Sequence, residues 1–270
     1  DQPDSGTGIN LHIDFSNSIP HRDTTTWEEF DAVKAANFDV NRRFVYHYCL
    51  FAHNLRDDDI WSGGLGEYPG NDFLIGLGDT STTTGQAGVF MHELGHNLYL
   101  HEGGGDAVHF KPNYLSVMNY YFAYIGIPPT NRIDYSREAL PDLDENNLNE
   151  NLGIQDGADM TMFYNGREVL TRPGTGPIDW DGDGLIETNV RADINRHPRY
   201  PCYGCGRTIL RGHDDWANIR LNSRGITNEW ADYVHENYVV EADIETLKSI
   251  RPTQSIQKFA EGPVAVPLYT

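Results

Sequence analysis

The chain has 270 residues, of which 39% are hydrophobic, enough for one large domain or two modest lobes around a real core. Its 40 acidic side chains against 20 basic ones give a net charge of −20, which argues against nucleic acids and anionic membrane surfaces as partners. No apolar run is long enough to cross a bilayer, so the composition predicts a globular protein without a membrane span.

The first hundred residues predict strands that alternate with helices. Three segments rich in β-forming residues predict strands: 9–15, 43–53 and 72–77. Residues 24–38 place apolar side chains at helical spacing and therefore predict a helix. A second helix is expected to begin near Thr84 or Gly85, because proline is absent and apolar side chains again recur at helical spacing.

The character of the sequence changes beyond Gly103, where Gly, Pro, Asn and Asp become frequent and long periodic segments become few. Residues 211–221 and 241–251 predict later helices, each preceded by acidic capping residues. The acid-rich run 141–153 predicts a capped helix, and the stretch from Pro252 predicts a loose or surface-wrapped terminus.

The three cysteines are too few for a disulfide framework. Cys202 and Cys205 form a single CxxC pair, and without a second pair a structural zinc site is disfavoured. We expect a small disulfide loop if the protein is secreted, and a buried free thiol at Cys49.

Residues 92–96 read HELGH, which is the HExxH pattern. On a helix, positions i and i+4 share one face, so His92 and His96 can present imidazole nitrogens to one ion. Glu93 then lies beside the open coordination position, where it can take a proton from water. The pattern predicts one catalytic zinc ion, and the alternative is a buried helix that happens to hold two histidines.

The segment 177–195 carries an acidic pattern typical of calcium loops. Three aspartates stand at alternating positions before a glycine: Asp179, Asp181, Asp183 and Gly184. Together with the carbonyl of Leu185 they match the first half of an EF-hand-type loop. We expect structural calcium here, and the alternative is an Asx-rich turn with a solvated face.

The second half of this loop departs from the EF-hand pattern. Its twelfth position is Val190, where a bidentate glutamate belongs. Glu187 or Asp193 would have to complete the coordination sphere. The ion would then pin a long irregular segment that has little core of its own.

Two stretches, HELGHNLYLHEGG at 92–104 and NYLSVMNY at 113–120, resemble the metzincin clan of zinc endopeptidases. That clan has an extended HExxHxxGxxH motif and a later tight turn built around a methionine, which Met118 would provide. Tyr120 matches the tyrosine that the astacin and serralysin branches place near zinc. The surrounding sequence is also similar to a group of secreted prokaryotic metzincins.

The resemblance implies an α+β, metzincin-like fold. An N-terminal mixed twisted sheet with backing and active-site helices would occupy residues 1–102. An irregular, loop-rich C-terminal subdomain would occupy residues 103–270, with the active-site cleft between the two parts of one catalytic domain. The Gly-rich segment 61–67 would be the edge strand that binds an extended peptide, and its alternative is an exposed flexible loop.

Two residues depart from the clan motif. Tyr99 replaces the glycine that ends the helix, so either Tyr99 takes a strained backbone conformation or the helix ends by another route. Glu102 replaces the third histidine, and a His₂Glu set is a known catalytic zinc site in other metalloproteases. We predict Glu102 as the third ligand, with His101 as the alternative if the turn shifts, and a two-histidine or empty site as the remaining possibility.

These residues and the metzincin resemblance together imply a secreted, monomeric zinc endopeptidase that acts on proteins or peptides. Glu93 would be the general base and then the acid, and Tyr120 would stabilise the tetrahedral intermediate. An alternative is a catalytically weakened or inactive relative that acts as a calcium-stabilised binding module. A further alternative is a zinc hydrolase with another substrate, such as a cell-wall peptide.

Overall fold

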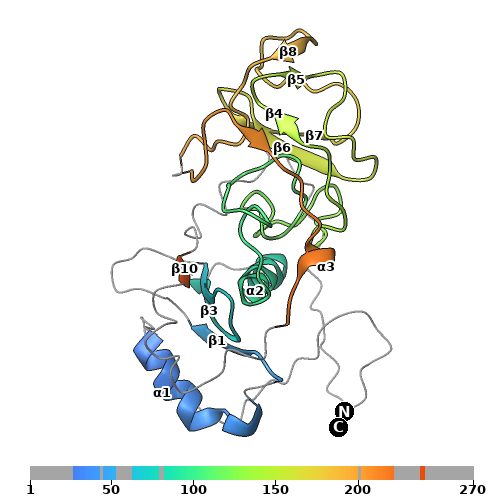
Figure 1. The fold of residues 1–270 in the computed structure, drawn as a ribbon. Helices are drawn as coiled ribbons and strands as arrows, with labels where there is room; N and C mark the ends of the chain where they lie inside the picture. Colours follow the sequence, from blue (N-terminus) through green and yellow to red (C-terminus); the bar gives the residue numbers. More distant parts are fainter. Residues whose placement is uncertain are drawn as a thin grey trace.

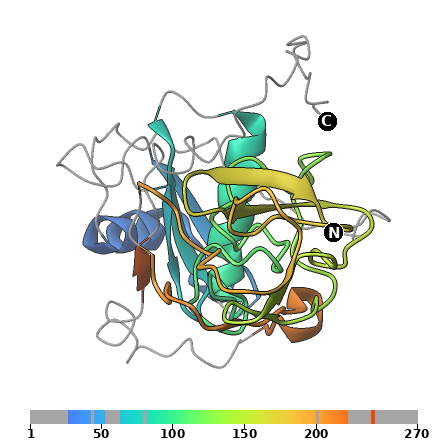
Figure 2. The ribbon, with the colours of Figure 1, turned by 90° about the horizontal axis from the view of Figure 1, so that it is seen from above.

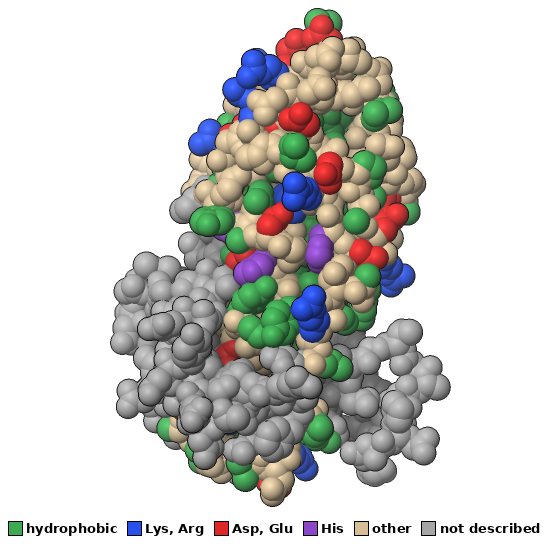
Figure 3. Space-filling model, in the orientation of Figure 1, with side chains coloured by type: hydrophobic (Ala, Val, Ile, Leu, Met, Phe, Trp, Pro, Cys, Tyr) green, Lys and Arg blue, Asp and Glu red, His purple; other side chains and the backbone are tan. Residues whose placement is uncertain are grey.

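The computed structural model describes residues 27–42, 45–52, 63–78, 82–199, 202–221 and 238–240. They form a mixed helix-and-strand protein with few helices and small open sheets, which agrees with the predicted α+β class (Figure 1). None of the described helices is long and apolar enough to cross a membrane. On the face drawn in Figure 3, acidic and basic side chains are interspersed rather than gathered by sign.

The elements around the HExxH helix form a layer of sheet between two helices (Figure 2). Their bounds are α1 (Trp27–Asn37), β1 (Tyr48–Ala52), β2 (Gly64–Glu67), β3 (Asp72–Gly76) and α2 (Thr83–Asn97). Alternate residues of β3 face opposite sides, as in any strand. Leu74 packs in a cluster with Phe30 of α1, whereas Phe73 belongs to the core cluster that contains Val89 of α2. Both helices therefore cover the sheet.

The predicted helix 24–38, strand 43–53 and strand 72–77 correspond to α1, β1 and β3 over the residues that are described. The second predicted helix begins at Thr83, one residue before the expected start. The predicted strand 9–15, the predicted helix 241–251 and the stretch from Pro252 lie outside the described residues.

The sheet order is β1-β3-β2-β10, where β10 is Tyr238–Val240. Strand β1 pairs with β3 in parallel, while β2 pairs antiparallel with β3 on one side and with β10 on the other. The described part of the Gly-rich segment 61–67 is thus an inner strand. The expectation that this segment forms the edge was wrong, because a strand from far along the chain pairs with it.

The rest of the chain is built from short pieces. They are the 3₁₀ turn η1 (Val40–Arg42), β4 (Leu143–Asp144), β5 (Leu148–Asn149), β6 (Met160–Tyr164), β7 (Val169–Pro173), β8 (Thr188–Val190), β9 (Ile209–Leu210) and α3 (Asp215–Asn218). The strands form three antiparallel pairs, β4 with β9, β5 with β8, and β6 with β7. The predicted helix 211–221 is reduced to the single turn α3.

The predicted capped helix at 141–153 is wrong, since this run holds β4, β5 and turns. Two of its glutamates are buried and accept backbone N–H groups from distant segments. Glu145 accepts from Ile194 at 2.7 Å, and Glu150 accepts from Trp180 at 2.6 Å. Buried carboxylates that hold other loops in place cannot also line a solvated helix face.

One large hydrophobic cluster runs through both parts of the chain. It includes Phe73 of β3, Val89 of α2, Tyr121 after the HExxH helix, and Trp180 and Leu210 of the later segments. The loop-rich second half therefore packs on the same core as α2 (Figure 1).

Candidate active site

Helix α2 carries the HExxH residues and begins at a regular N-cap. The side-chain oxygen of Thr82 accepts the backbone N–H of Gly85 at 3.0 Å, which satisfies one of the amides that a helix start leaves unpaired. His92, Glu93 and His96 then fall within the buried part of the helix.

The two histidines of α2 have the same hydrogen-bond arrangement. The Nδ1 atom of His92 lies 2.7 Å from the carbonyl oxygen of Val117, and that of His96 lies 2.8 Å from the carbonyl oxygen of Leu100. A carbonyl only accepts, so each Nδ1 carries the proton and each Nε2 carries a lone pair. This is the tautomer in which an imidazole binds a metal through Nε2, with its orientation fixed by a backbone partner.

The two imidazole rings are also close and buried. Their centroids are 4.9 Å apart, and the residues are 1% and 0% exposed for His92 and His96. The helix spacing has therefore placed both rings on one face, as the HExxH pattern predicts.

Glu93 is fully buried beneath the glycines of β2. A Cβ atom built on Gly64 would lie 2.1 Å from Oε1 of Glu93, and one built on Gly66 would lie 2.9 Å from its backbone oxygen. Only glycine fits at these positions. Cys49 is a free cysteine, as expected, but it is partly rather than fully buried; burial, with a smaller contribution from the Glu93 carboxylate, raises the pKa of its thiol.

Met118 lies against α2, one turn from His92. A Cβ on Gly95 would lie 2.2 Å from its sulfur, so glycine at 95 permits this contact. The turn around Met118 is held by hydrogen bonds: Ser116 Oγ accepts the N–H of Met118 at 3.1 Å and donates to Asp215 at 2.5 Å. The turn also contains Val117, whose carbonyl orients His92.

Asp215 is a buried carboxylate that sequence reasoning missed. It begins α3 and accepts from the hydroxyl of Tyr114 at 2.8 Å and from the N–H of Ser136 at 3.0 Å, in addition to Ser116. Burial raises its pKa. Its only sequence signal was acidity at a predicted helix start, which did not distinguish it from the half-buried N-cap residue Asp214.

Tyr99 adopts the left-handed backbone conformation, with φ of 75°. The helix ends in a Schellman-type arrangement: the N–H of Leu100 bonds the oxygen of Gly95 at 2.9 Å, and the N–H of Tyr99 bonds that of His96 at 3.1 Å. Of the two alternatives for the helix end, the strained tyrosine is the one adopted.

The two candidate third ligands point to different neighbours. Glu102 is 4% exposed, and its Oε1 accepts from the hydroxyl of Tyr120 at 3.4 Å. The ring of Tyr120 lies parallel to that of His92, with centroids 5.7 Å apart. His101 instead stacks on Tyr68 at 4.0 Å. Glu102 is thus on the Tyr120 side of the two histidines, and His101 is packed against a separate ring.

The predicted zinc ligands do not lie at mutual ligand distance. Among the described residues, only one group of three His, Cys, Asp or Glu side chains has ligand atoms within 4.8 Å of one another, and it lies elsewhere. A metal bound by His92, His96 and Glu102 would need at least one of these side chains to shift.

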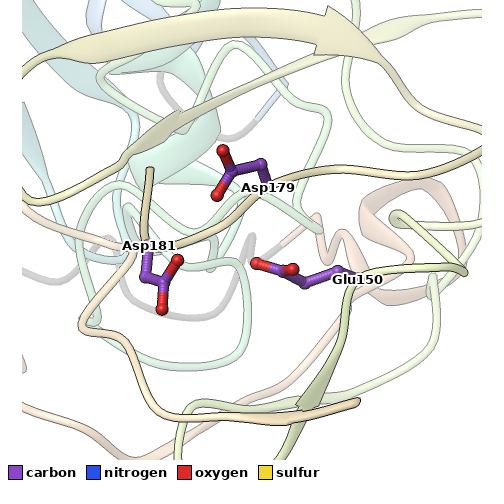
Figure 4. Close-up of side chains that lie close together, drawn as sticks. All are labelled: Glu150, Asp179 and Asp181. Carbon is purple, nitrogen blue, oxygen red and sulfur yellow. The ribbon is translucent and has the colours of Figure 1, made fainter. Parts of the chain in front are cut away.

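The close group consists of Glu150, Asp179 and Asp181, and its carboxylates face one another (Figure 4). It could hold a metal ion. Two predicted calcium ligands, Asp179 and Asp181, belong to it, whereas the carboxylates of Asp183 and Glu187 lie outside it.

The residues outside the group take other roles in the same loop. Asp183 Oδ1 accepts the N–H of Leu185 at 2.8 Å, and Leu185 is 58% exposed. The N–H of Glu187 donates to Oε2 of Glu150 at 3.0 Å. The third member of the close group is Glu150, 29 positions before Asp179, rather than Glu187 or Asp193.

Comparison with known proteins adds no family to this description. No protein-family model matches the chain, and no curated protein or solved structure is significantly similar to it. Function is therefore inferred from the residues and their geometry.

Proposed function

We propose that the protein is a secreted zinc-dependent endopeptidase of the metzincin type. The observation that carries the proposal is the matched pair of buried imidazoles on α2, each with Nδ1 bonded to a backbone carbonyl. This arrangement holds the Nε2 atoms of His92 and His96, which can bind a metal, on the same face of the helix.

The chemical types of the donors fit zinc, and binding would require at least one of the three side chains to shift. Two imidazole nitrogens and the carboxylate of Glu102 are the His₂Glu ligands that catalytic zinc accepts. Glu102 is buried beside Tyr120, which itself lies over His92. Bound zinc would supply a Lewis acid that polarises a peptide carbonyl and makes water more acidic.

Residues of the chain would carry out the proton transfer and stabilise the developing charge. Glu93, buried between α2 and the glycines of β2, takes a proton from water and returns it to the leaving amine. The hydroxyl of Tyr120 stabilises the negative charge that develops on the substrate carbonyl oxygen. An extended peptide would have to displace β10 to pair with β2.

The experiment is metal analysis combined with Glu93→Gln. The purified protein should contain about one zinc ion per chain and should cleave an unfolded protein such as reduced casein. Glu93→Gln should lower this cleavage by at least about 10³-fold while the circular dichroism spectrum stays unchanged. The matched control is Glu168→Gln, the same charge change at an exposed position.

A zinc-free protein after preparation in excess zinc would overturn the proposal, as would full activity in Glu93→Gln. A calcium-stabilised binding module is the second candidate, because Glu150, Asp179 and Asp181 are the described group already at ligand spacing. This second function requires that the protein binds calcium and shows no cleavage that depends on Glu93.

A further inference from the structure

The loop closed by the Cys202–Cys205 disulfide has no part in the proposed chemistry, yet it is bonded to the residue beside Tyr120. The backbone N–H of His109 donates to the carbonyl of Tyr203 at 3.0 Å, and the backbone N–H of Tyr203 donates to Nδ1 of His109 at 3.3 Å. The loop is therefore docked on His109 by two hydrogen bonds.

The loop also approaches the preceding residue closely. A Cβ on Gly204, which has φ of 72°, would lie 2.8 Å from Cγ2 of Val108. Glycine at this position lets the loop backbone lie directly against residues 108 and 109.

The ring of His109 connects this loop to the candidate active site. Because its Nδ1 accepts a backbone N–H, the imidazole is neutral with its proton on Nε2. The ring meets that of Tyr120 edge-on, with centroids 4.8 Å apart and an interplanar angle of 74°. Tyr120 in turn lies over His92 and donates to Glu102. A short series of contacts thus leads from the disulfide to the candidate zinc ligands.

A purely stabilising role explains this loop poorly. The entropy that a disulfide removes from the unfolded chain is smallest for short loops, and the two cysteines are three positions apart. The ring of Tyr203 buries little apolar surface, since Tyr203 is 68% exposed, whereas Cys202 packs against the core. Besides the two hydrogen bonds with His109, the loop places the sulfurs of Cys202 and Cys205 at 3.2 and 2.9 Å from the carbonyl oxygen of Asn195.

We propose that His109, held by the Cys202–Cys205 loop, is a positioning residue for Tyr120, so that reduction of this disulfide loosens the tyrosine. A dithiol reductant donates two electrons, the S–S bond breaks, two thiols form with two protons, and the dithiol becomes a disulfide. The catalytic consequence rests on the proposed function, whereas the effect on the Tyr120 ring does not.

The first test observes Tyr120 directly and needs no activity. Protein labelled with ¹³C in its tyrosine rings gives a ring signal for Tyr120, which is assigned with Tyr120→Phe. Reduction with dithiothreitol, followed by thiol titration, should shift or broaden this signal. The Cys49→Ser protein should respond like the wild type, since the thiol of Cys49 is not involved. An unchanged Tyr120 signal in fully reduced protein would overturn the inference.

The second test separates positioning from general stability. His109→Ala should lower kcat about tenfold with KM and zinc content retained, because a displaced catalytic group costs rate rather than binding. His109→Phe keeps a ring edge against Tyr120 and should restore most of kcat. Equal kcat in His109→Ala and wild type would contradict the inference. If the wild type cleaves nothing, the proposed function fails, and the Tyr120 signal alone decides the role of His109.

Discussion

At the residue scale, the proposed zinc site leaves two candidates for the third ligand, Glu102 and His101. The structure gives Glu102 a buried position beside Tyr120 and gives His101 a stacking partner in Tyr68. The backbone of His101 is also fixed, since it exchanges two hydrogen bonds with Gly104 at 2.9 and 2.8 Å. Burial lowers the pKa of His101, which favours its neutral form.

Glu102→Ala should therefore weaken zinc binding by roughly 100-fold, because one of the three protein ligands and its part of the binding free energy are lost. His101→Ala should leave zinc affinity within a factor of about three, because its ring is already packed against Tyr68. Zinc affinity is measured by competition with a chromogenic chelator at constant pH. Stronger weakening in His101→Ala than in Glu102→Ala would show that His101 is the third ligand.

Tyr99 allows the cost of the left-handed helix end to be measured. A residue with a Cβ atom loses about 1 kcal/mol in this conformation, whereas glycine does not. Tyr99→Gly should therefore be more stable than Tyr99→Ala by about 1 kcal/mol in urea unfolding. Both variants lose the same ring contacts, so their difference isolates the backbone term. Equal stability would mean that position 99 does not hold φ near 75° in solution.

At the element scale, the sequence predicted the helices and strands better than it predicted which elements pack against one another. The helical spacing around HELGH was sufficient to predict α2, and richness in β-forming residues was sufficient to predict β1 and β3. The glycines of β2 could not be explained from sequence, because their reason is the buried carboxylate of Glu93 on another element. The position of Glu150 beside Asp179 and Asp181 could not be predicted for the same reason, because these partners lie about 30 positions later in the chain.

The loop around Asp179 gives a prediction about an ion. If Glu150, Asp179 and Asp181 bind calcium, saturating calcium at about 100 times its Kd should add about 3 kcal/mol to the free energy of unfolding. This corresponds to a rise in Tm of roughly 5–10 °C for a domain of this size. Glu150→Gln should abolish the calcium-dependent rise.

Asp183→Asn is the matched control, because the side chain of Asp183 lies outside the group. It should keep most of the calcium response measured by differential scanning calorimetry. A Tm that does not respond to calcium in the wild type, or equal losses in the two variants, would remove the calcium assignment from Glu150.

At the scale of the whole molecule, several buried acids couple stability to pH. Burial, with the nearby Asp72 carboxylate, raises the pKa of Glu67 to about 8, and burial raises that of Glu145 to about 7. An acid whose pKa is higher in the folded protein than in the unfolded chain contributes its full stabilisation below pH 4.5, its approximate pKa in the unfolded chain. This contribution is lost as the pH rises through the folded-state pKa. The lowered pKa values of His47, His101 and His197 reduce the stability of the protein only below about pH 6.5.

Between pH 6.5 and 8, the raised pKa values of Glu67 and Glu145 therefore contribute a fall in the free energy of unfolding as pH rises. Glu67→Gln should flatten this fall, because glutamine keeps an acceptor for the N–H groups of Asn71 and Asp72 without an ionisable group. Urea unfolding at several pH values measures the slope, with Glu168→Gln as control. A slope unchanged by Glu67→Gln would place the coupling at other residues.

The pairing of β10 with β2 also bears on how the molecule is made. Val240 pairs with Leu65, a separation of 175 positions along the chain. A ribosome delivers the chain from its N-terminus, so β2 and the HExxH helix emerge long before their last strand does. Until then the hydrogen-bonding edge of β2 next to Glu93 is open to any extended chain, including a neighbouring nascent copy. Completion of this sheet is a late, non-local event, and its loop-closure entropy makes it slow compared with the formation of α2.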